Sequence, residues 1–260
     1  MSDHGDDHAV TEALPEYEKT LRMVERARLA EGFVRQVELT AGPFLDRPLA
    51  QCRVVDIGCG YGHGVVELAR RCASVVGVEP NPVLARNARE NAAAQGLDNV
   101  EIREGTIAAI DDVDEFDLVV LDNVLEHIED QPEAVRVISR CLRPGGVAFV
   151  LVPNRAWPIE VHYGLPFLSW LPLPLASAYL RASGRGSDYR DASYAPTLRS
   201  LRRLFAPHPE LRATLTLPGD VSLAEGGGSP VYRIGVAALR RFPQLWAISK
   251  AFLLVVRKAS

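Results

Sequence analysis

The residues with the clearest chemical potential form one stretch, residues 54–64, with the sequence Val-Val-Asp-Ile-Gly-Cys-Gly-Tyr-Gly-His-Gly. Its glycines stand at alternate positions and lack a Cβ, so the chain can turn sharply and let a ligand approach its backbone. Residues 65–71 suit a helix whose first N–H groups would point into the turn, where a carboxylate or phosphate could bind. The stretch therefore predicts a strand that ends in a cofactor-binding turn.

Two further acidic residues end apolar runs. Residues 74–79 finish at Glu79, 21 positions after Gly58, and residues 116–122 finish at Asp122. An acid at the tip of the strand beside a glycine turn can accept hydrogen bonds from both hydroxyls of a ribose. The spacing therefore predicts a nucleoside ligand.

Two histidines are candidates for proton transfer. His127 follows Leu125-Glu126, and His162 lies between Trp157 and Tyr163. Each has a structural interpretation, as a histidine bonded within its loop, and a functional one, as a base that titrates near neutral pH. The residues alone leave both interpretations open.

The elements that must position these residues alternate between strands and helices. Strands are expected at residues 53–57, 74–79, 100–103, 116–122, 147–152, 213–217 and 252–257, and helices at 65–71, 82–95, 132–142 and 197–205. This order predicts an α/β fold, a Rossmann-like, doubly wound, mostly parallel seven-stranded sheet with helices on both faces. Ligands of such sheets sit at the carboxyl ends of the strands.

The domain organisation follows from what surrounds these elements. Residues 1–14 are expected to be a flexible tail, and residues 15–260 one domain that begins with N-terminal cap helices over residues 15–50. Residues 153–195, rich in proline and aromatic residues, predict a substrate-binding lid inserted after the fifth strand. Its apolar run 165–175 suits peripheral contact with a lipid surface, where Arg181, Arg185 and Arg190 would meet an anionic group.

Composition narrows the remaining classes. The chain has 260 residues, 47% of them hydrophobic, and a formal charge of −4, which does not favour nucleic acid as a partner. Its four cysteines show no metal or disulfide spacing, and there is no secretory signal or transmembrane run, so a cytoplasmic monomer or homodimer is expected.

The glycine register decides between cofactors. A G-x-G-x-x-G dinucleotide motif is not formed, because the sixth position is His63 when counted from Gly58 and Val65 when counted from Gly60. The chain instead has Asp-x-Gly-x-Gly-x-Gly, and here it resembles the class I S-adenosylmethionine-dependent methyltransferases, notably the bacterial small-molecule O-methyltransferases of the ubiquinone-pathway type. The resemblance rests on five motifs in order, at residues 56–62, 78–80, 116–119, 125–127 and 142–146.

The resemblance implies a role for each residue of the cofactor site. Asp56 would accept from the methionine amine, the turn backbone would lie beside the amino-acid moiety, and Glu79 would bind the ribose. Many relatives have an acid at the position of Thr106 that binds the adenine amine, so the Ile107 backbone is expected to take over here. The implied cofactor-binding set is Asp56, Gly58, Cys59, Gly60, Gly62, Glu79, Pro80, Thr106, Ile107, Asp122 and Asn123.

The resemblance also raises a metal ion. Relatives carry Glu-x-x-Glu-His as a metal-binding set, and this chain has Asn123 in place of the first glutamate. An amide is a weaker ligand than a carboxylate, so affinity would fall. Glu126, His127 and His162 remain as ligands for Mg²⁺, which would lower the pKa of a bound hydroxyl.

The sequence thus predicts an S-adenosylmethionine-dependent O-methyltransferase in which His127 and His162 are the catalytic candidates. The acceptor is expected to be a small molecule, sugar or lipid-linked, with a saccharide or glycan precursor favoured over a phenolic or prenylated quinone-like compound. Two alternatives from other classes are a nicotinamide-dependent oxidoreductase, which the failed glycine register disfavours, and a non-catalytic cofactor-binding protein.

Overall fold

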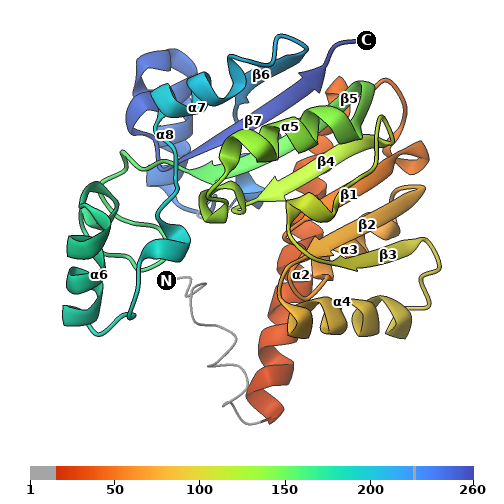
Figure 1. The fold of residues 1–260 in the computed structure, drawn as a ribbon, viewed down its shortest axis with the longest axis horizontal. Coiled ribbons are helices and arrows are strands. Elements are labelled where there is room, and N and C mark those ends of the chain that lie inside the picture. Colours follow the sequence, from red (N-terminus) through yellow and green to blue (C-terminus); the bar gives the residue numbers. More distant parts are fainter. Residues whose placement is uncertain (1–15, 225–226) are drawn as a thin grey trace.

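A computed structural model describes residues 16–224 and 227–260 of the chain, and Figure 1 shows their fold. Seven strands form one sheet in the order β3-β2-β1-β4-β5-β7-β6, which confirms the predicted α/β class. Only β7 runs antiparallel to its neighbours β5 and β6. The strands are β1 (Arg53–Ile57), β2 (Ser74–Glu79), β3 (Val100–Glu104), β4 (Phe116–Asp122), β5 (Leu142–Pro153), β6 (Leu211–Thr216) and β7 (Ala251–Lys258).

The sheet is buried because helices cover both of its faces. Successive strand residues point to opposite faces, so Val55 and Val119 pack in one apolar cluster while Val54 and Val120 pack in the other. Helices α5 (Gln131–Cys141) and α7 (Leu198–Phe205) cover the first face, and α2 (Glu16–Ala41) and α3 (His63–Ala69) cover the second. The central strands β1, β2 and β4 accordingly carry their charged residues near their ends and are apolar between them.

Helix α4 (Pro82–Ala94) lies along β2 and β3 at one edge of the sheet. It begins as its sequence predicted: Asn81 Oδ1 accepts hydrogen bonds from the backbone N–H groups of Val83 and Leu84, and Pro82 is the first helical residue. This cap fixes the direction in which the chain leaves β2, and so places the acidic tip of that strand.

The fifth strand differs from its predicted bounds. Leu142, expected to end the preceding helix, and residues 143–146, expected to form a turn before a strand at 147, already belong to β5. The register against β4 shifts between Phe116 and Leu118, and Gly145 has φ +78°. Between the pairs Phe116–Leu142 and Leu118–Val147, β5 advances by five residues and β4 by two, so the Pro-Gly-Gly sequence forms an enlarged bulge inside the strand.

Within residues 15–50, where cap helices were expected, the structure has the long helix α2 followed by two short 3-10 segments, η1 (Gly42–Phe44) and η2 (Leu49–Gln51). The tail predicted for residues 1–14 lies outside the described residues. Two helices were missed altogether: α6 (Leu173–Ala182) within the insertion, and α8 (Pro230–Arg241), which is followed by the 3-10 segment η8 (Pro243–Ile248). Both run through segments in which prolines and glycines obscure the helical period.

The insertion after β5 has a small apolar core of its own and lies apart from the sheet (Figure 1). Leu165 and Leu168 are buried there against Ala176 and Leu180, so these two leucines do not contribute to the lipid-facing run that the sequence suggested. Phe167, Trp170 and Leu175 from the same run are exposed. Among the described helices, none is both long and apolar enough to cross a bilayer.

Candidate active site

The glycine turn after β1 is held against the neighbouring strand β2. The backbone N–H groups of Gly58 and Cys59 both donate to the carbonyl of Val78, at 2.8 and 3.1 Å. Gly58, Gly60 and Gly62 all have positive φ, between +55° and +77°, a region that strongly favours glycine. The turn is therefore a conformation that this residue pattern permits and few others would.

The glycines of the turn meet different surroundings. A Cβ on Gly58 would lie 2.5 Å from Val124 Cγ2, and one on Gly62 would lie 2.8 Å from Ala88 Cβ on α4. A Cβ on Gly60 would meet nothing within 4 Å. Gly60 thus borders open space at the carboxyl edge of the sheet, where the sequence analysis places the amino-acid moiety of a cofactor.

Glu79 ties the tip of β2 to this turn. It is buried, and its Oε2 accepts a hydrogen bond from the Gly60 N–H while its Oε1 accepts one from the Asn81 N–H, both at 2.9 Å. An ionised carboxylate has about four acceptor positions, so both oxygens keep a lone pair for ribose hydroxyls. Pro80, between these two contacts, is exposed at the same edge.

Three acids converge around Asp56. Glu79 and Asp122 are the last residues of β2 and β4, and Asp56 is the next-to-last residue of β1, the strand between them in the sheet. Burial, with a further contribution from the charges of Asp122 and Glu79, raises the pKa of Asp56 to about 8. Such a concentration of negative charge in a buried site favours a cationic ligand, because a nearby positive charge stabilises the carboxylate form.

Cys59, Thr106 and Ile107 lie where the sequence analysis expects them, at the same edge. The Cys59 sulfur packs beside Gly77 of β2, and burial raises the pKa of its thiol. Thr106 is exposed and its Oγ1 accepts from the Ala108 N–H at 3.4 Å, while Ile107 is buried. The Thr106 hydroxyl thus caps its own short turn, which suits a local structural role.

Asn123 is engaged by its neighbour rather than by the histidine loop. Its Nδ2 donates to Asp122 Oδ1 at 3.0 Å, its backbone N–H donates to the Leu151 carbonyl, and its φ is +53°. The amide therefore belongs to the acidic edge of the cofactor site.

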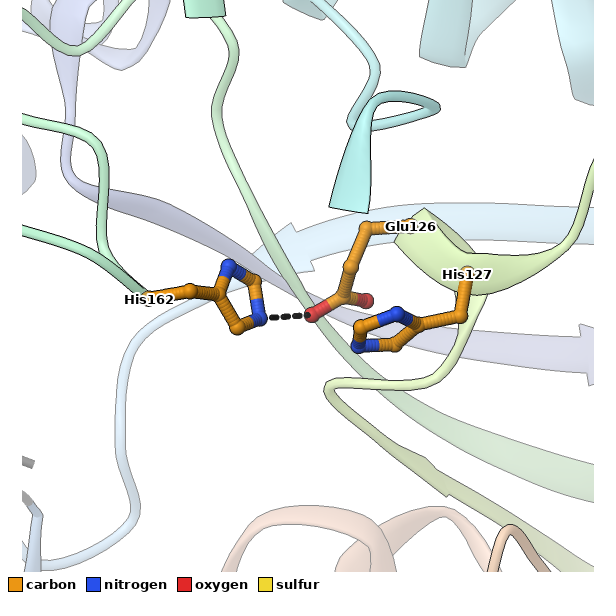
Figure 2. Close-up of side chains that lie close together, drawn as sticks. All are labelled: Glu126, His127 and His162. Carbon is orange, nitrogen blue, oxygen red and sulfur yellow. Dashed lines mark ion pairs between the residues drawn. The ribbon is translucent and has the colours of Figure 1, made fainter. Parts of the chain in front are cut away.

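Glu126, His127 and His162 come together, as Figure 2 shows. His162 Nε2 lies 3.7 Å from Glu126 Oε1, and the two imidazole rings are 5.3 Å apart in an edge-to-face arrangement. One donor atom from each of the three side chains lies within 4.8 Å of the others. The insertion thus brings His162 back to the loop that follows β4.

Glu126 is the most constrained member of this cluster. It is 0% exposed, and neither of its carboxylate oxygens has a hydrogen-bond partner among the described residues. Burial raises its pKa, and the nearby His127 opposes that shift. A buried carboxyl without donors requires a proton, a cation or a ligand to satisfy it.

Glu160 orients His162. This buried glutamate contacts His162 Nδ1 through Oε1 at 2.8 Å, and its Oε2 accepts from the backbone N–H groups of His162 and Tyr163. A carboxylate on Nδ1 favours the tautomer with its proton there, which leaves the Nε2 lone pair facing Glu126. The sequence placed Glu160 near His162, but it held no sign of this bond.

The histidine loop is fixed to the end of the insertion by contacts that the sequence analysis missed. The Tyr194 N–H donates to the Glu126 carbonyl at 3.2 Å, and Gln131 Nε2 donates to the carbonyls of Leu125 and Tyr194, each at 2.8 Å. No sequence signal marks Gln131, which is simply the first residue of α5. These bonds make the position of Glu126 depend on the insertion.

The fold and the acidic glycine turn together define a class of protein, an α/β domain built for a cationic nucleoside cofactor. The family described as "Methyltransferase domain" matches residues 49–173. The ubiquinone biosynthesis O-methyltransferase of Brucella ovis is 32% identical over 177 residues, which cover 62% of this chain and 71% of that protein. The chain belongs to the class I S-adenosylmethionine-dependent methyltransferases.

Other relatives agree over a shorter region. The ubiquinone biosynthesis O-methyltransferase of Methylobacterium nodulans is 36% identical over 129 residues, 48% of this chain and 51% of that protein. The chain spans about half the length of several of these curated relatives. S-adenosylmethionine is the methyl donor of the family.

Solved structures support the fold alone. The YcgJ protein of Bacillus subtilis superposes with a TM-score of 0.54 at 19% identity, over 82% of this chain and 94% of that one. The plantazolicin methyltransferase BpumL gives a TM-score of 0.53 at 16% identity, over 90% of this chain and 84% of that one.

Proposed function

We propose that this protein transfers the methyl group of S-adenosylmethionine to a hydroxyl on a phenolic or prenylated quinone-like acceptor. The relatives named above are O-methyltransferases of ubiquinone biosynthesis, which supports oxygen as the methylated atom. These relatives favour a phenolic or quinone-like acceptor over the saccharide or glycan precursor that the sequence analysis favoured, so the order of the two acceptors is reversed. The acceptor is proposed to bind under the insertion, residues 153–195, which would act as a lid.

The observation that carries the proposal is the oriented imidazole of His162. Glu160 holds Nδ1, so Nε2 is the atom available to take a proton. In the proposed step the acceptor O–H gives its proton to His162 Nε2, the oxygen attacks the methyl carbon in line, and the C–S bond breaks to leave neutral S-adenosylhomocysteine. The phenol needs less help than a sugar alcohol would, because its pKa is close to 10.

The acids of the cofactor site would hold the donor before this step. Asp56, with Glu79 and Asp122 beside it, is proposed to face the ammonium group of the methionine moiety and to stabilise the positive charge of the sulfonium. Methyl transfer removes that charge. The product should therefore bind less well to the acidic edge than the substrate does, which favours its release.

Glu126, His127 and His162 also have donor atoms arranged as in a metal site. The unpartnered, fully buried Glu126 carboxylate fits a cation, but two imidazole nitrogens with a single carboxylate suit Zn²⁺, Fe²⁺ or Mn²⁺ better than Mg²⁺, which prefers oxygen. An ion held by Glu126, His127 and His162 would lower the pKa of a coordinated acceptor hydroxyl. His162 would then be a ligand instead of a base.

The decisive experiment is methyl transfer to a catechol and to its prenylated analogue, followed by product mass, with wild type, His162→Asn and the control His208→Asn, a half-buried histidine outside the candidate site that contacts Glu210. We expect His162→Asn to lower kcat by about 10²- to 10⁴-fold, the usual contribution of a general base, with the affinity for S-adenosylhomocysteine unchanged. Full turnover by His162→Asn would refute the base.

Chelation separates the two versions of the mechanism. The metal-free version predicts an unchanged rate after dialysis against a chelator, and the metal version predicts loss of activity and recovery with the added ion. Turnover on a saccharide but on neither phenol would refute the proposed acceptor. Methyl transfer to any acceptor would exclude a non-catalytic binding protein.

A further inference from the structure

The corner of the molecule formed by α7, α8 and η8 is basic although the chain as a whole is acidic. Residues 198–206 and 227–250 contain seven positively charged residues and no aspartate or glutamate, against a net charge of −4 for the whole chain. They are Arg199, Arg202, Arg203, Arg233, Arg240, Arg241 and Lys250. Within the described part of the chain, the three arginines of α7 form no ion pair, and they are exposed.

The arginines of α7 line a surface hollow. It has a volume of about 370 Å³ and lies between α7 and η8, bordered by Arg199, Arg202, Arg203, Leu198, Ala206 and Ala247. Guanidinium groups bind phosphate oxygens in a bidentate manner. The hollow therefore combines a phosphate-binding rim with an apolar floor.

The neighbouring helix adds exposed apolar side chains. Val231 and Ile234 of α8 are 78% and 69% exposed, and Phe242 and Ile248, which flank and end η8, are 46% and 58% exposed. Among the described residues of α8, Val236 is the one buried apolar side chain. The guanidinium of Arg241 stands 5.4 Å from the ring centre of Phe242, so charge and apolar surface are interleaved.

This corner lies at the ligand edge of the sheet. β6 is parallel to β5, so it ends at the edge where β5 ends, and β7 begins there. The chain between β6 and β7 carries α8 and η8, and η8 packs against both α8 and α7 (Figure 1). A surface that binds this corner would therefore face the same side of the molecule as the candidate active site.

We infer that α7, α8 and η8 form a docking surface for an anionic phospholipid bilayer. Basic side chains draw the corner to the headgroups, and Val231, Ile234, Phe242 and Ile248 enter the interface, which is how amphipathic basic helices bind membranes. The inference goes beyond the proposed function, because it concerns where the protein works and holds for any acceptor.

The test is co-sedimentation of the full chain with vesicles of phosphatidylcholine alone and of phosphatidylcholine mixed with phosphatidylglycerol. We expect binding to the mixed vesicles only, and release as salt is raised. Arg202→Ser/Arg203→Ser should weaken binding by about 25-fold, about fivefold for each charge. Val231→Ser/Ile234→Ser should weaken it by about tenfold or more.

A matched control removes the same charge elsewhere. Arg86→Ser/Arg136→Ser changes two exposed arginines on α4 and α5 and should bind vesicles like the wild type. Circular dichroism and S-adenosylhomocysteine affinity establish that every variant is folded. The vesicle assay and the S-adenosylhomocysteine assay contain no methyl acceptor. An error in the proposed acceptor would therefore not change the vesicle result.

Several outcomes would overturn the inference. These are equal binding to neutral vesicles, equal loss in the control pair, and full competition by inorganic phosphate, which would indicate a small-anion site. A dimer in sedimentation velocity that Val231→Ser/Ile234→Ser converts to monomer, with no vesicle binding, would assign the face to a second copy of the chain.

Discussion

At the scale of single residues, Glu160 and His162 resemble a positioned base more than two independent side chains. Glu160 gives one oxygen to the imidazole and the other to two backbone N–H groups, so it is fixed before it fixes the histidine. The orientation of the imidazole is thus supplied by one group.

Glu160→Gln should lower kcat by about 10- to 100-fold, the usual effect of changing a group that orients another. If the glutamine Oε1 accepts from His162 Nδ1, its NH₂ group faces the two backbone N–H groups that donate to Glu160 Oε2, so the imidazole should lose its fixed orientation. The measurement is kcat and the KM for the acceptor at saturating cofactor, with the exposed Glu129→Gln as control. A kcat equal to that of Glu129→Gln would show that Glu160 does not position the base.

Asp56 should make cofactor affinity depend on pH. Its pKa of about 8 means that it is largely protonated in the free protein at neutral pH, and a cationic ligand favours the ionised form. Binding should therefore release a proton, and affinity should rise as pH rises, by up to about tenfold per unit, and level off above about pH 8. Titration calorimetry with S-adenosylmethionine in buffers of different ionisation enthalpy measures both effects.

Asp56→Asn removes the titrating group and should flatten this pH dependence, while Asp98→Asn, on an exposed loop, should keep it. If proton release persists in Asp56→Asn, the titrating group lies elsewhere in the site.

At the scale of elements, the glycine turn offers a matched pair of substitutions. Gly62→Ala and Gly60→Ala both place an alanine at positive φ, which costs about 1–2 kcal/mol. Gly62→Ala also brings its Cβ to 2.8 Å from Ala88 and 2.9 Å from the α4 backbone, so its total cost should reach about 2–4 kcal/mol. Urea unfolding should rank Gly62→Ala as clearly less stable.

Gly60→Ala should behave in the opposite way towards the cofactor. Its Cβ meets no protein atom within 4 Å but enters the space proposed for the methionine moiety, so affinity should fall more than stability does. Equal losses of stability in the two variants would contradict the difference in packing seen here.

The difference between local sequence pattern and tertiary packing explains which elements the sequence could predict. The strands at 53–57, 74–79 and 116–122 were predicted to the residue, because short apolar runs with an acid at or beside their carboxyl ends have few alternatives in a buried parallel sheet. The start of β5 was wrong, because Pro144-Gly145-Gly146 has the composition of a turn and only pairing with β4 extends it. Tertiary context decided that segment, and no local pattern carries it.

The residues of the candidate site also differ in whether local sequence pattern or tertiary packing places them. Motifs located Asp56, Glu79, Glu126 and His127 because each lies at or soon after the carboxyl end of a strand, and these ends meet at one edge of a parallel sheet. The contact of His162 with Glu126 depends on how the insertion folds back, and residues 153–195 contain no period that reveals it. Helix α8 was missed for a related reason, since a helix with one buried apolar residue has no core-facing stripe to detect.

At the scale of the whole molecule, the insertion between β5 and α7 forms a second, smaller apolar core. Leu168→Ala should cost about 2–5 kcal/mol within that core. Because the insertion's core is separate from the two clusters of the sheet, we expect faster hydrogen exchange confined to residues 153–195, weaker turnover and unchanged affinity for S-adenosylhomocysteine.

Leu175→Ala is the matched control, since Leu175 lies on α6 of the same insertion but is exposed. It should leave hydrogen exchange and turnover nearly as they are. If the insertion and the sheet of Leu168→Ala instead unfolded at the same denaturant concentration, the two cores would form one cooperative unit.

The position of β7 has a consequence for biosynthesis. β6 meets the rest of the sheet only through β7, which is made later and inserts between β5 and β6. While the ribosome is still adding residues 217–250, β5 therefore presents a bare edge, and β6 has no strand to join. The nascent chain must keep both edges from pairing with other polypeptides until residues 251–258 have left the exit tunnel.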